Sequence, residues 1–278
     1  MKRGLSRAGL GAIGSEIEFV KLASKYGFEA VDADAQALIA ADGPERAREL
    51  LDRSGVALGA IGLPVEWRTD EAAFRAGLPK LAEAGAAAMQ LGCTACCTYI
   101  LPSTDHKPAH FMALATRRLR IAADILDAYG IRLGLEFVGP HHLRTMWEHP
   151  FIWTMEETLD WIGAIGAPNV GLLLDAYHWY TTGGTAADIL RLRPDRIVHV
   201  HLNDARDVPA EEALDNDRLY PGEGVIDLAS FLRALRDIGY TGVVAQEILT
   251  KTPPADSPET LLQRSRDGFD RVFAALEV

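Results

Sequence analysis

Short apolar runs alternate with longer amphipathic stretches along most of the chain, and this pattern predicts strands that alternate with helices. The apolar runs are rich in Val, Ile, Leu, Ala and Gly, as is typical of strands buried on both faces of a parallel sheet. The predicted strands cover approximately residues 5–10, 28–33, 56–62, 87–92, 131–138, 170–176, 197–203 and 242–249. The predicted helices cover Glu16–Tyr26, Glu45–Ser54, Glu71–Ala84, Ala109–Tyr129 and Leu228–Ile238.

Glycines mark the ends of these helices. Gly27, Gly55, Gly85, Gly130 and Gly239 each follow a helical stretch, where a residue in the left-handed conformation commonly ends a helix. Eight strands that alternate with helices fit either a closed barrel or a doubly wound open sheet. The length of 278 residues is normal for a barrel, which typically needs about 250 residues.

Composition and charge restrict the classes of partner. Hydrophobic residues make up 48% of the chain, so a large buried core is expected and wholesale disorder is excluded. The formal net charge of −11 argues against a nucleic-acid backbone or an anionic membrane surface as partner. The basic start lacks the apolar stretch of a signal peptide, and no apolar run approaches the roughly 20 residues of a membrane span. We therefore expect a soluble cytoplasmic protein.

The three cysteines lie close together at Cys93, Cys96 and Cys97. They are too few and too close for a disulfide framework, which is consistent with a reducing compartment. No second cysteine pair accompanies them, so we interpret them as structural residues rather than as a zinc or redox site.

Four predicted strands end in side chains that can bind a metal ion: Glu136, Asp175, His201 and Glu247. Each one alone could be a polar residue that meets solvent at the end of a strand. Four such endings on consecutive strands place the groups around one mouth of a barrel, because the carboxyl ends of its parallel strands meet there. Two glutamates, one aspartate and one histidine suit Mn²⁺ or Mg²⁺, and Co²⁺ or Zn²⁺ is also compatible.

The sequence around these residues resembles a known family. Leu135–Gly139, Gly171–His178 and His199–Asp204 resemble the xylose isomerase-like sugar isomerase and epimerase barrels, and Asp217–Leu228 extends the resemblance towards 2-keto-myo-inositol isomerases. It covers the chain well from the fifth strand onward and the first hundred residues only by pattern. The motifs are specific for the superfamily and less so for a substrate. The resemblance implies an α/β fold, a (β/α)₈ TIM barrel, as a single domain over residues 1–278.

The resemblance also implies a metal-dependent isomerase or epimerase. Glu136, Asp175, His201 and Glu247 are then the ligands of one divalent ion, with Mn²⁺ favoured, and Glu136 and Glu247 also carry the catalytic proton. A metal that chelates a carbonyl and its neighbouring hydroxyl acidifies the carbon-bound proton and stabilises an enediolate. The substrate is expected to be a small neutral sugar or cyclitol such as 2-keto-myo-inositol, because no basic cluster for a phosphate lies on the late loops.

Four further residues are candidate substrate contacts. The resemblance implies that His178 lines the site and that Arg206 contacts the substrate. Trp67 follows the third predicted strand and could form one wall of a sugar pocket. His142 is the fourth, although neither it nor His141 maps onto the inositol enzymes. Relatives that deglycosylate or dehydrate keto-sugars use a histidine near this position as base, so a metal-dependent lyase is the alternative within the fold.

A glycine-rich motif raises a different class of function. Gly9–Gly14 match G-x-G-x-x-G, precede a helix and are followed at a suitable distance by Asp32, as in dinucleotide-binding proteins. The alternative class is therefore an NAD-dependent oxidoreductase. Polar residues in the preceding strand and two glutamates at the start of the helix speak against it.

Two further expectations concern His199 and assembly. His199 lies two residues from His201, shares its strand face, and is expected to be a hydrogen-bonded histidine of the barrel interior rather than a fifth ligand. Barrels of this kind often associate, so a homo-oligomer is compatible with the sequence. No patch in the sequence identifies an interface.

Overall fold

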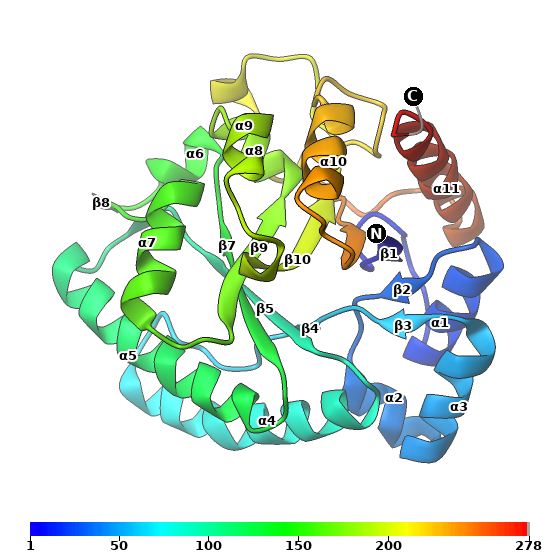
Figure 1. Ribbon diagram of the computed structural model, residues 1–278, viewed down its shortest axis with the longest axis horizontal. Helices are drawn as coiled ribbons and strands as arrows, with labels where there is room; N and C mark the ends of the chain where they lie inside the picture. The colour runs from blue at the N-terminus through cyan, green and yellow to red at the C-terminus, as the bar shows by residue number, and fades with distance from the viewer. Residues whose placement is uncertain (277–278) are drawn as a thin grey trace.

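The computed structural model describes residues 1–276 and forms a parallel sheet that curls into a barrel (Figure 1). The nine strands follow the order β3-β2-β1-β11-β10-β9-β7-β5-β4 around the sheet. Their bounds are β1 (Lys2–Leu5), β2 (Ala30–Val31), β3 (Ala57–Leu58), β4 (Ile61–Gly62), β5 (Ala95–Ile100), β7 (Arg132–Phe137), β9 (Val170–Asp175), β10 (Ile197–Leu202) and β11 (Val243–Gln246).

The two strands at the ends of this sheet, β3 and β4, are neighbours in the sequence and are separated only by Gly59 and Ala60. The backbone N–H of Gly59 donates to the carbonyl of Val31 at 2.7 Å, and that of Leu63 donates to the carbonyl of Cys97 at 2.9 Å. One interrupted strand therefore joins both ends of the sheet and closes it. The barrel thus has eight strand positions, which confirms the (β/α)₈ prediction.

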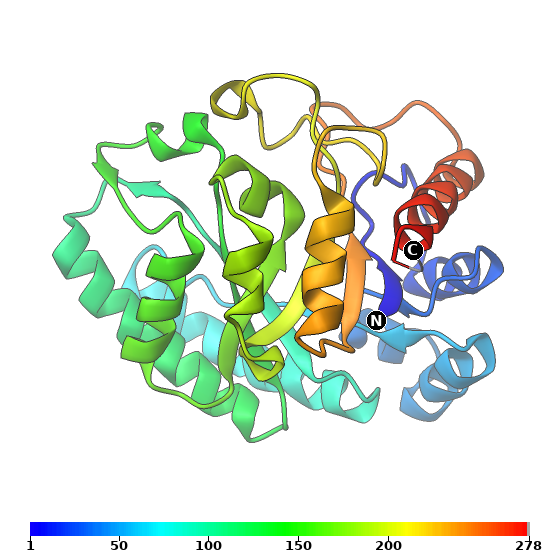
Figure 2. The same cartoon turned by 45° about the horizontal axis from the view of Figure 1, so that its top comes forward.

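Helices cover the outside of the barrel, as Figure 1 and the tilted view in Figure 2 show. Most of the helices follow a strand and pack an apolar face inward, as the alternating sequence pattern requires. The loops also contain short helices and a two-stranded antiparallel ribbon formed by β6 (Ser103–Thr104) and β8 (His149–Pro150). The helix bounds are α1 (Glu16–Lys25), α2 (Ala35–Asp42), α3 (Pro44–Ser54), α4 (Glu71–Gln90), α5 (Pro108–Asp127), α6 (His141–Arg144), α7 (Met155–Ile165), α8 (Ala176–Thr181), α9 (Ala186–Leu190), α10 (Leu228–Asp237) and α11 (Pro258–Ala274).

The helix-ending glycines agree with prediction at four of the five positions. Gly27, Gly55, Gly130 and Gly239 all have a positive φ, which a side chain would strain. Gly85 was expected to end a helix, but it lies inside α4. That helix continues to Gln90 and is followed by a glycine with positive φ, Gly92.

Two of the strand predictions are wrong. Residues 87–92 were expected to be a strand, but they continue and end α4, because the alanine-rich run there is a strong helix former. The fourth barrel strand is β5, which contains Cys96 and Cys97 rather than preceding them. Residues 5–10 were also expected to be a strand, but β1 ends at Leu5 and a turn follows.

The C-terminal ends of the strands and their loops build one end of the barrel. The longest loop, residues 203–227, connects β10 with α10, and Figure 2 shows it in yellow above that end. Asp204 organises it, because its carboxylate accepts the backbone N–H groups of Ala205, Gly222, Gly224 and Ile226 at 2.9–3.0 Å. None of the helices within residues 1–276 is both long and apolar enough to cross a membrane.

Candidate metal centre

The four predicted metal ligands come together at the C-terminal end of the barrel. Glu136 is in β7, Asp175 ends β9, His201 is in β10, and Glu247 directly follows β11. Their four ligand atoms all lie within 4.8 Å of one another. Parallel strands of a barrel bring their ends to one rim, so residues more than a hundred positions apart meet.

His201 lies at the centre of this group. Its Nδ1 atom is 3.3 Å from Glu136 Oε1, 3.4 Å from Glu247 Oε2 and 3.8 Å from Asp175 Oδ2. Three carboxylates that converge on one imidazole nitrogen repel one another unless a cation lies among them. The donor set of three carboxylate oxygens and one imidazole nitrogen therefore fits a divalent metal ion.

Asp175 is held in place by the start of the following helix. Its Oδ1 atom accepts the backbone N–H groups of Tyr177 at 2.6 Å and His178 at 3.1 Å, which caps α8. Its Oδ2 atom faces the other ligands and accepts a hydrogen bond from Asn203 Nδ2 at 2.9 Å. One oxygen is thus used by the fold, and the other is directed into the site.

Arg218 contacts two of the predicted metal ligands, and the sequence analysis missed it. Its side chain is 1% exposed, and Nη1 lies 3.0 Å from Asp175 Oδ2 and 2.9 Å from Glu247 Oε2. Nη2 lies 2.7 Å from Asp215 Oδ1 and 3.3 Å from His178 Nε2. Arg218 lies in the segment Asp217–Leu228, which carried part of the family resemblance. Because this segment is in a long loop, the sequence gave no indication that the Arg218 side chain reaches the predicted metal ligands.

The proximity of these charges shifts their pKa values. Burial, together with the nearby Glu247, raises the pKa of Glu136. Burial also opposes ionisation of Glu247, but His201 and Arg218 outweigh it and lower the pKa of that carboxyl. For His201, burial disfavours the charge, but Glu247, Asp32 and Glu136 raise its pKa well above the ordinary value. In the absence of metal, a proton on His201 therefore takes the place of the cation.

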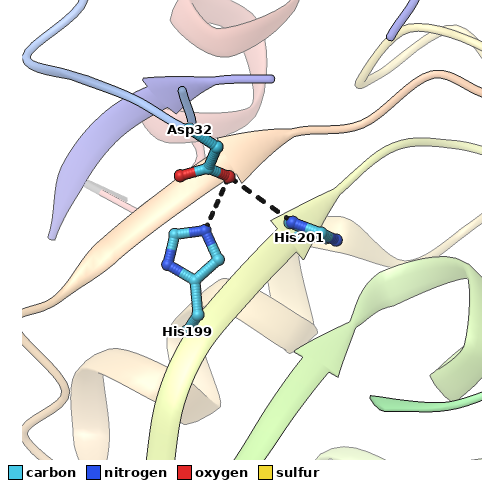
Figure 3. Close-up of side chains that lie close together, drawn as sticks. All are labelled: Asp32, His199 and His201. Carbon is cyan, nitrogen blue, oxygen red and sulfur yellow. Dashed lines mark hydrogen bonds and ion pairs between the residues drawn. The ribbon is translucent and has the colours of Figure 1, made fainter. Parts of the chain in front are cut away.

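On the other side of His201 lies Asp32, which follows β2. Asp32 Oδ2 is 2.9 Å from His199 Nε2 and 3.5 Å from His201 Nε2 (Figure 3). The expectation that His199 is a hydrogen-bonded interior histidine is confirmed, since it is 1% exposed and bonds Asp32. Burial opposes the charge of Asp32, but His199 lowers its pKa below the ordinary value.

A cavity of about 510 Å³ opens above the ligands, and Glu136, His201, Glu247 and Asp32 line it. Tyr99 also lines this cavity, and its ring is 48% exposed. Trp67 does not line it: this ring is 1% exposed, donates to Thr98 Oγ1 at 3.1 Å and packs beneath the Arg68 guanidinium. The same guanidinium lies 4.1 Å from the Tyr99 ring centre, so Trp67 supports the wall and Tyr99 forms its exposed surface.

The other candidate substrate contacts lie in different surroundings. His178 is buried beside the ligands, and its Nδ1 accepts the N–H of Gly139 at 3.3 Å. His142 is half-buried in α6, and burial lowers its pKa against the opposing charge of Asp215. The structure does not bring Arg206 to the cavity: its side chain is 55% exposed and pairs with Asp217 at 2.9 Å.

The glycine-rich motif serves the turn after β1. Gly9 and Gly11 have positive φ values, and the Gly9 carbonyl accepts the hydroxyl of Tyr220. Arg7 fills this turn, because its guanidinium donates to the carbonyls of Ile13 and Gly14. A dinucleotide fingerprint belongs to an open sheet whose strand order reverses, whereas this sheet is closed.

The class of protein follows from a comparison with known families. Residues 20–271 match the family model of the xylose isomerase-like TIM barrel. The chain therefore belongs to the xylose isomerase-like TIM barrel family, which confirms the resemblance seen in its motifs.

Characterised relatives match about half of the chain. The inosose isomerase of Bacillus velezensis is 35% identical over 128 residues, which are 45% of this chain and 42% of that protein. The D-psicose 3-epimerase of Enterocloster bolteae is 30% identical over 135 residues, 49% of this chain and 39% of that protein. The 3-dehydroshikimate dehydratase of Pseudomonas aeruginosa is 30% identical over 139 residues, 49% of this chain and 20% of that protein. The matched segments thus span less than half the length of each relative.

Solved structures match the whole chain. A xylose isomerase domain protein from Alicyclobacillus acidocaldarius is 35% identical, superposes with a TM-score of 0.92 and covers 100% of both chains. The IOLI protein, whose structure contains a bound zinc atom, is 22% identical with a TM-score of 0.82 and covers 99% of this chain and 98% of its own. At this identity, the second match shows a shared fold.

Proposed function

We propose that this protein is a metal-dependent isomerase or epimerase of a neutral keto-cyclitol or ketose such as 2-keto-myo-inositol. The observation that carries the proposal is the convergence of Glu136, Asp175 and Glu247 on the Nδ1 atom of His201 at the floor of a cavity. The similarity to an inosose isomerase and to a D-psicose 3-epimerase supports this class of reaction. Their names describe an isomerase of an inosose and a 3-epimerase of D-psicose.

The four residues would hold one divalent ion, which we propose to be Mn²⁺, although the donor set also accepts Mg²⁺, Co²⁺ or Zn²⁺. When bound, such an ion supplies the Lewis acid that polarises the substrate carbonyl and stabilises the enediolate. Glu136 and Glu247 flank His201 at 3.3 and 3.4 Å and are the proposed proton carriers. One accepts the carbon-bound proton, and the same or the other residue returns it to a different carbon or face.

In this proposal His178 contacts the substrate and Arg218 positions the metal ligands. His178 Nδ1 accepts the N–H of Gly139 at 3.3 Å, and its Nε2 lies 3.3 Å from Arg218 Nη2 beside the ligand cluster. The proposed role of this imidazole is a hydrogen bond to a substrate hydroxyl or carbonyl oxygen. Arg218 pairs with Asp175 and Glu247 and holds their carboxylates in place, so that the ligand geometry exists before substrate enters.

The cavity favours an uncharged substrate. Arg7 is the only lysine or arginine among the described residues that line it. Its guanidinium already pairs with Glu16 at 3.1 Å and donates to two backbone carbonyls. A phosphate group would therefore find no unpaired cation there, whereas hydroxyl groups can bond the polar side chains Ser6 and Gln36.

The three cysteines have free thiols, and two of them are buried. Free thiols are typical of proteins in a reducing compartment, which supports the proposal that this enzyme works in the cytoplasm. The partner that we propose is the small-molecule substrate itself. A homo-oligomer stays a prediction of the family resemblance.

A metal-dependent lyase of the 3-keto-glycoside deglycosidase or dehydroshikimate dehydratase type is the second candidate. The observation that favours it is the Nδ1 atom of His142, which is buried and has no hydrogen-bond partner among the described residues. Burial also keeps this imidazole neutral, as a base requires. The similarity to a 3-dehydroshikimate dehydratase supports the same reaction class.

Metal analysis combined with solvent deuterium exchange distinguishes these candidates. We expect near-stoichiometric divalent metal in the wild type and metal-dependent deuterium uptake into 2-keto-myo-inositol, both reduced in Glu247→Gln. Glu49→Gln is the matched control, because this glutamate is 61% exposed on α3. Metal without exchange would redirect the search to other ketoses and lyase substrates. A wild type that binds no metal after reconstitution would contradict the proposal.

A further inference from the structure

Two histidines of β10 converge on one carboxylate oxygen beside the proposed metal centre. His199 and His201 present their Nε2 atoms to Asp32 Oδ2 at 2.9 and 3.5 Å, and their rings are nearly perpendicular (Figure 3). Asp32 comes from the end of β2, on the other side of β1 and β11 in the barrel. This contact is separate from the carboxylates that face the metal position.

The contact with Asp32 favours one tautomer of His201 when an ion is bound. Both nitrogens face carboxylate oxygens, Nδ1 at 3.3 Å from Glu136 Oε1 and Nε2 at 3.5 Å from Asp32 Oδ2. An ion held by Nδ1 would leave one ring proton, and Nε2 would carry it towards Asp32, because a carboxylate can only accept. With the proton on Nε2, the lone pair of His201 is on Nδ1, the atom that faces Glu136, Asp175 and Glu247. A metal ligand requires this arrangement, since the lone pair forms the bond to the ion.

The second oxygen of the Asp32 carboxylate lies in an energetically unfavourable environment. This atom, Oδ1, is buried and has no hydrogen-bond partner among the described residues, which is unfavourable for a carboxylate. Oδ1 lies over Gly59, where a Cβ atom would come within 2.6 Å of it. Gly59 interrupts the third barrel strand between β3 and β4, so the interruption leaves the space that Asp32 occupies.

We propose that Asp32 is a positioning residue that holds His201 with Nδ1 directed at the metal. His199 donates a second hydrogen bond to Asp32, and the missing side chain of Gly59 leaves room for the Asp32 carboxylate. This inference rests on the proposed metal-dependent function. Asp32 acts through His201 and does not bind the ion. An outer carboxylate of this kind typically changes metal affinity by about 10- to 100-fold.

The same three residues could instead hold a second metal ion, because their ligand atoms also lie within 4.8 Å of one another. That ion would need His201 to bind metals through both nitrogens, and the ring would have to lose both protons. A single proton on Nε2 satisfies Asp32 without this loss. The proposal therefore specifies one bound ion per chain.

Metal titration of the purified protein with Co²⁺ tests the role of Asp32. We expect one Co²⁺ per chain in the wild type, about 10- to 100-fold weaker binding in Asp32→Asn, and a changed visible absorption band of the bound Co²⁺. His199→Gln keeps an N–H donor and should bind more tightly than His199→Phe. The melting temperature of each metal-free variant shows whether it is folded.

Gly59→Ala tests the same idea without altering any polar group. The added Cβ would displace Asp32, so Co²⁺ binding should weaken, whereas Gly62→Ala in β4 meets nothing within 4 Å and should bind like the wild type. Neither glycine has a positive φ, so alanine is compatible with both backbones.

The outcomes separate the two proposals. Equal Co²⁺ affinity in folded Asp32→Asn and wild type would overturn the positioning role and leave the metal centre intact. Two ions in the wild type and one in Asp32→Asn would overturn it in favour of a second metal site. A wild type that binds no Co²⁺ would overturn the proposed function itself.

Discussion

The Nη1 atom of Arg218 lies 3.0 Å from Oδ2 of Asp175, and both side chains are buried within the ligand cluster. The same Nη1 atom contacts Glu247 at 2.9 Å, so one guanidinium group neutralises two proposed metal ligands. Buried carboxylates without a partner are strongly unfavourable. Arg218 therefore permits these carboxylates to assemble without a metal, so that the proposed ion would join a site that is already formed.

Removal of this guanidinium should destabilise the metal-free protein. We expect Arg218→Met to lower the free energy of unfolding by about 3–5 kcal/mol, because it leaves buried carboxylates without their partner. Saturating divalent metal should restore part of the loss, since the ion replaces the missing positive charge. Urea unfolding with and without metal measures both effects. A variant whose stability loss is the same in EDTA and in excess metal would contradict this account.

The ring of Tyr99 should contribute to substrate binding rather than to chemistry. It is exposed in the cavity wall and braced by Arg68, so it offers a rigid apolar face to a sugar ring. Tyr99→Ala should raise KM for 2-keto-myo-inositol by roughly three- to tenfold with little change in kcat, which corresponds to about 0.5–1.5 kcal/mol. Tyr99→Phe retains the ring and is the matched control. An alanine variant with the KM of the wild type would rule out this role.

The raised pKa of His201 predicts how the stability of the metal-free protein depends on pH. The folded protein holds a proton on His201 at a pH where the unfolded chain, with a histidine pKa of about 6.5, has lost it. The stabilisation is therefore fully present below about pH 6.5 and is lost as the pH rises through the folded-state pKa, by up to ~1.4 kcal/mol per pH unit. His201→Gln should remove this slope. Urea unfolding in EDTA at several pH values checks it, and equal slopes in the two proteins would refute the assignment.

The close contact between α8 and the segment that follows β7 should make Gly139 sensitive to substitution. A Cβ atom on Gly139 would lie 2.8 Å from the carbonyl oxygen of His178 and would also meet Thr181. Gly139→Ala should therefore lower the free energy of unfolding by about 1–3 kcal/mol and shift the helix that Asp175 caps. Gly163→Ala in α7 has free space and should be neutral or stabilising. The free energies of unfolding of the two variants measure this effect. Equal values for Gly139→Ala and Gly163→Ala would show that α8 accommodates the added Cβ and would contradict the prediction.

Local sequence patterns were sufficient for most of the secondary structure near the site. The strands that contain Glu136, Asp175 and His201 end within two residues of their predicted bounds, because apolar runs of this length and composition specify buried strands. The error at residues 87–92 had a local cause as well. The apolar run there fits a buried strand, but its alanines are strong helix formers and continue α4 to Gln90.

The sequence by itself determined that four ligand-type side chains follow buried strands, and the barrel then had to bring those strand ends to one rim. It could not determine the second layer around them. Asp32 and His199 are separated by 167 positions, and Arg218 reaches Asp175 and Glu247 from a loop that Asp204 shapes. Strand-end positions are fixed by short-range periodicity, whereas these contacts depend on barrel closure and loop folding. The tertiary structure therefore decided which charges surround the candidate ligands and which histidine nitrogen faces the carboxylates among them.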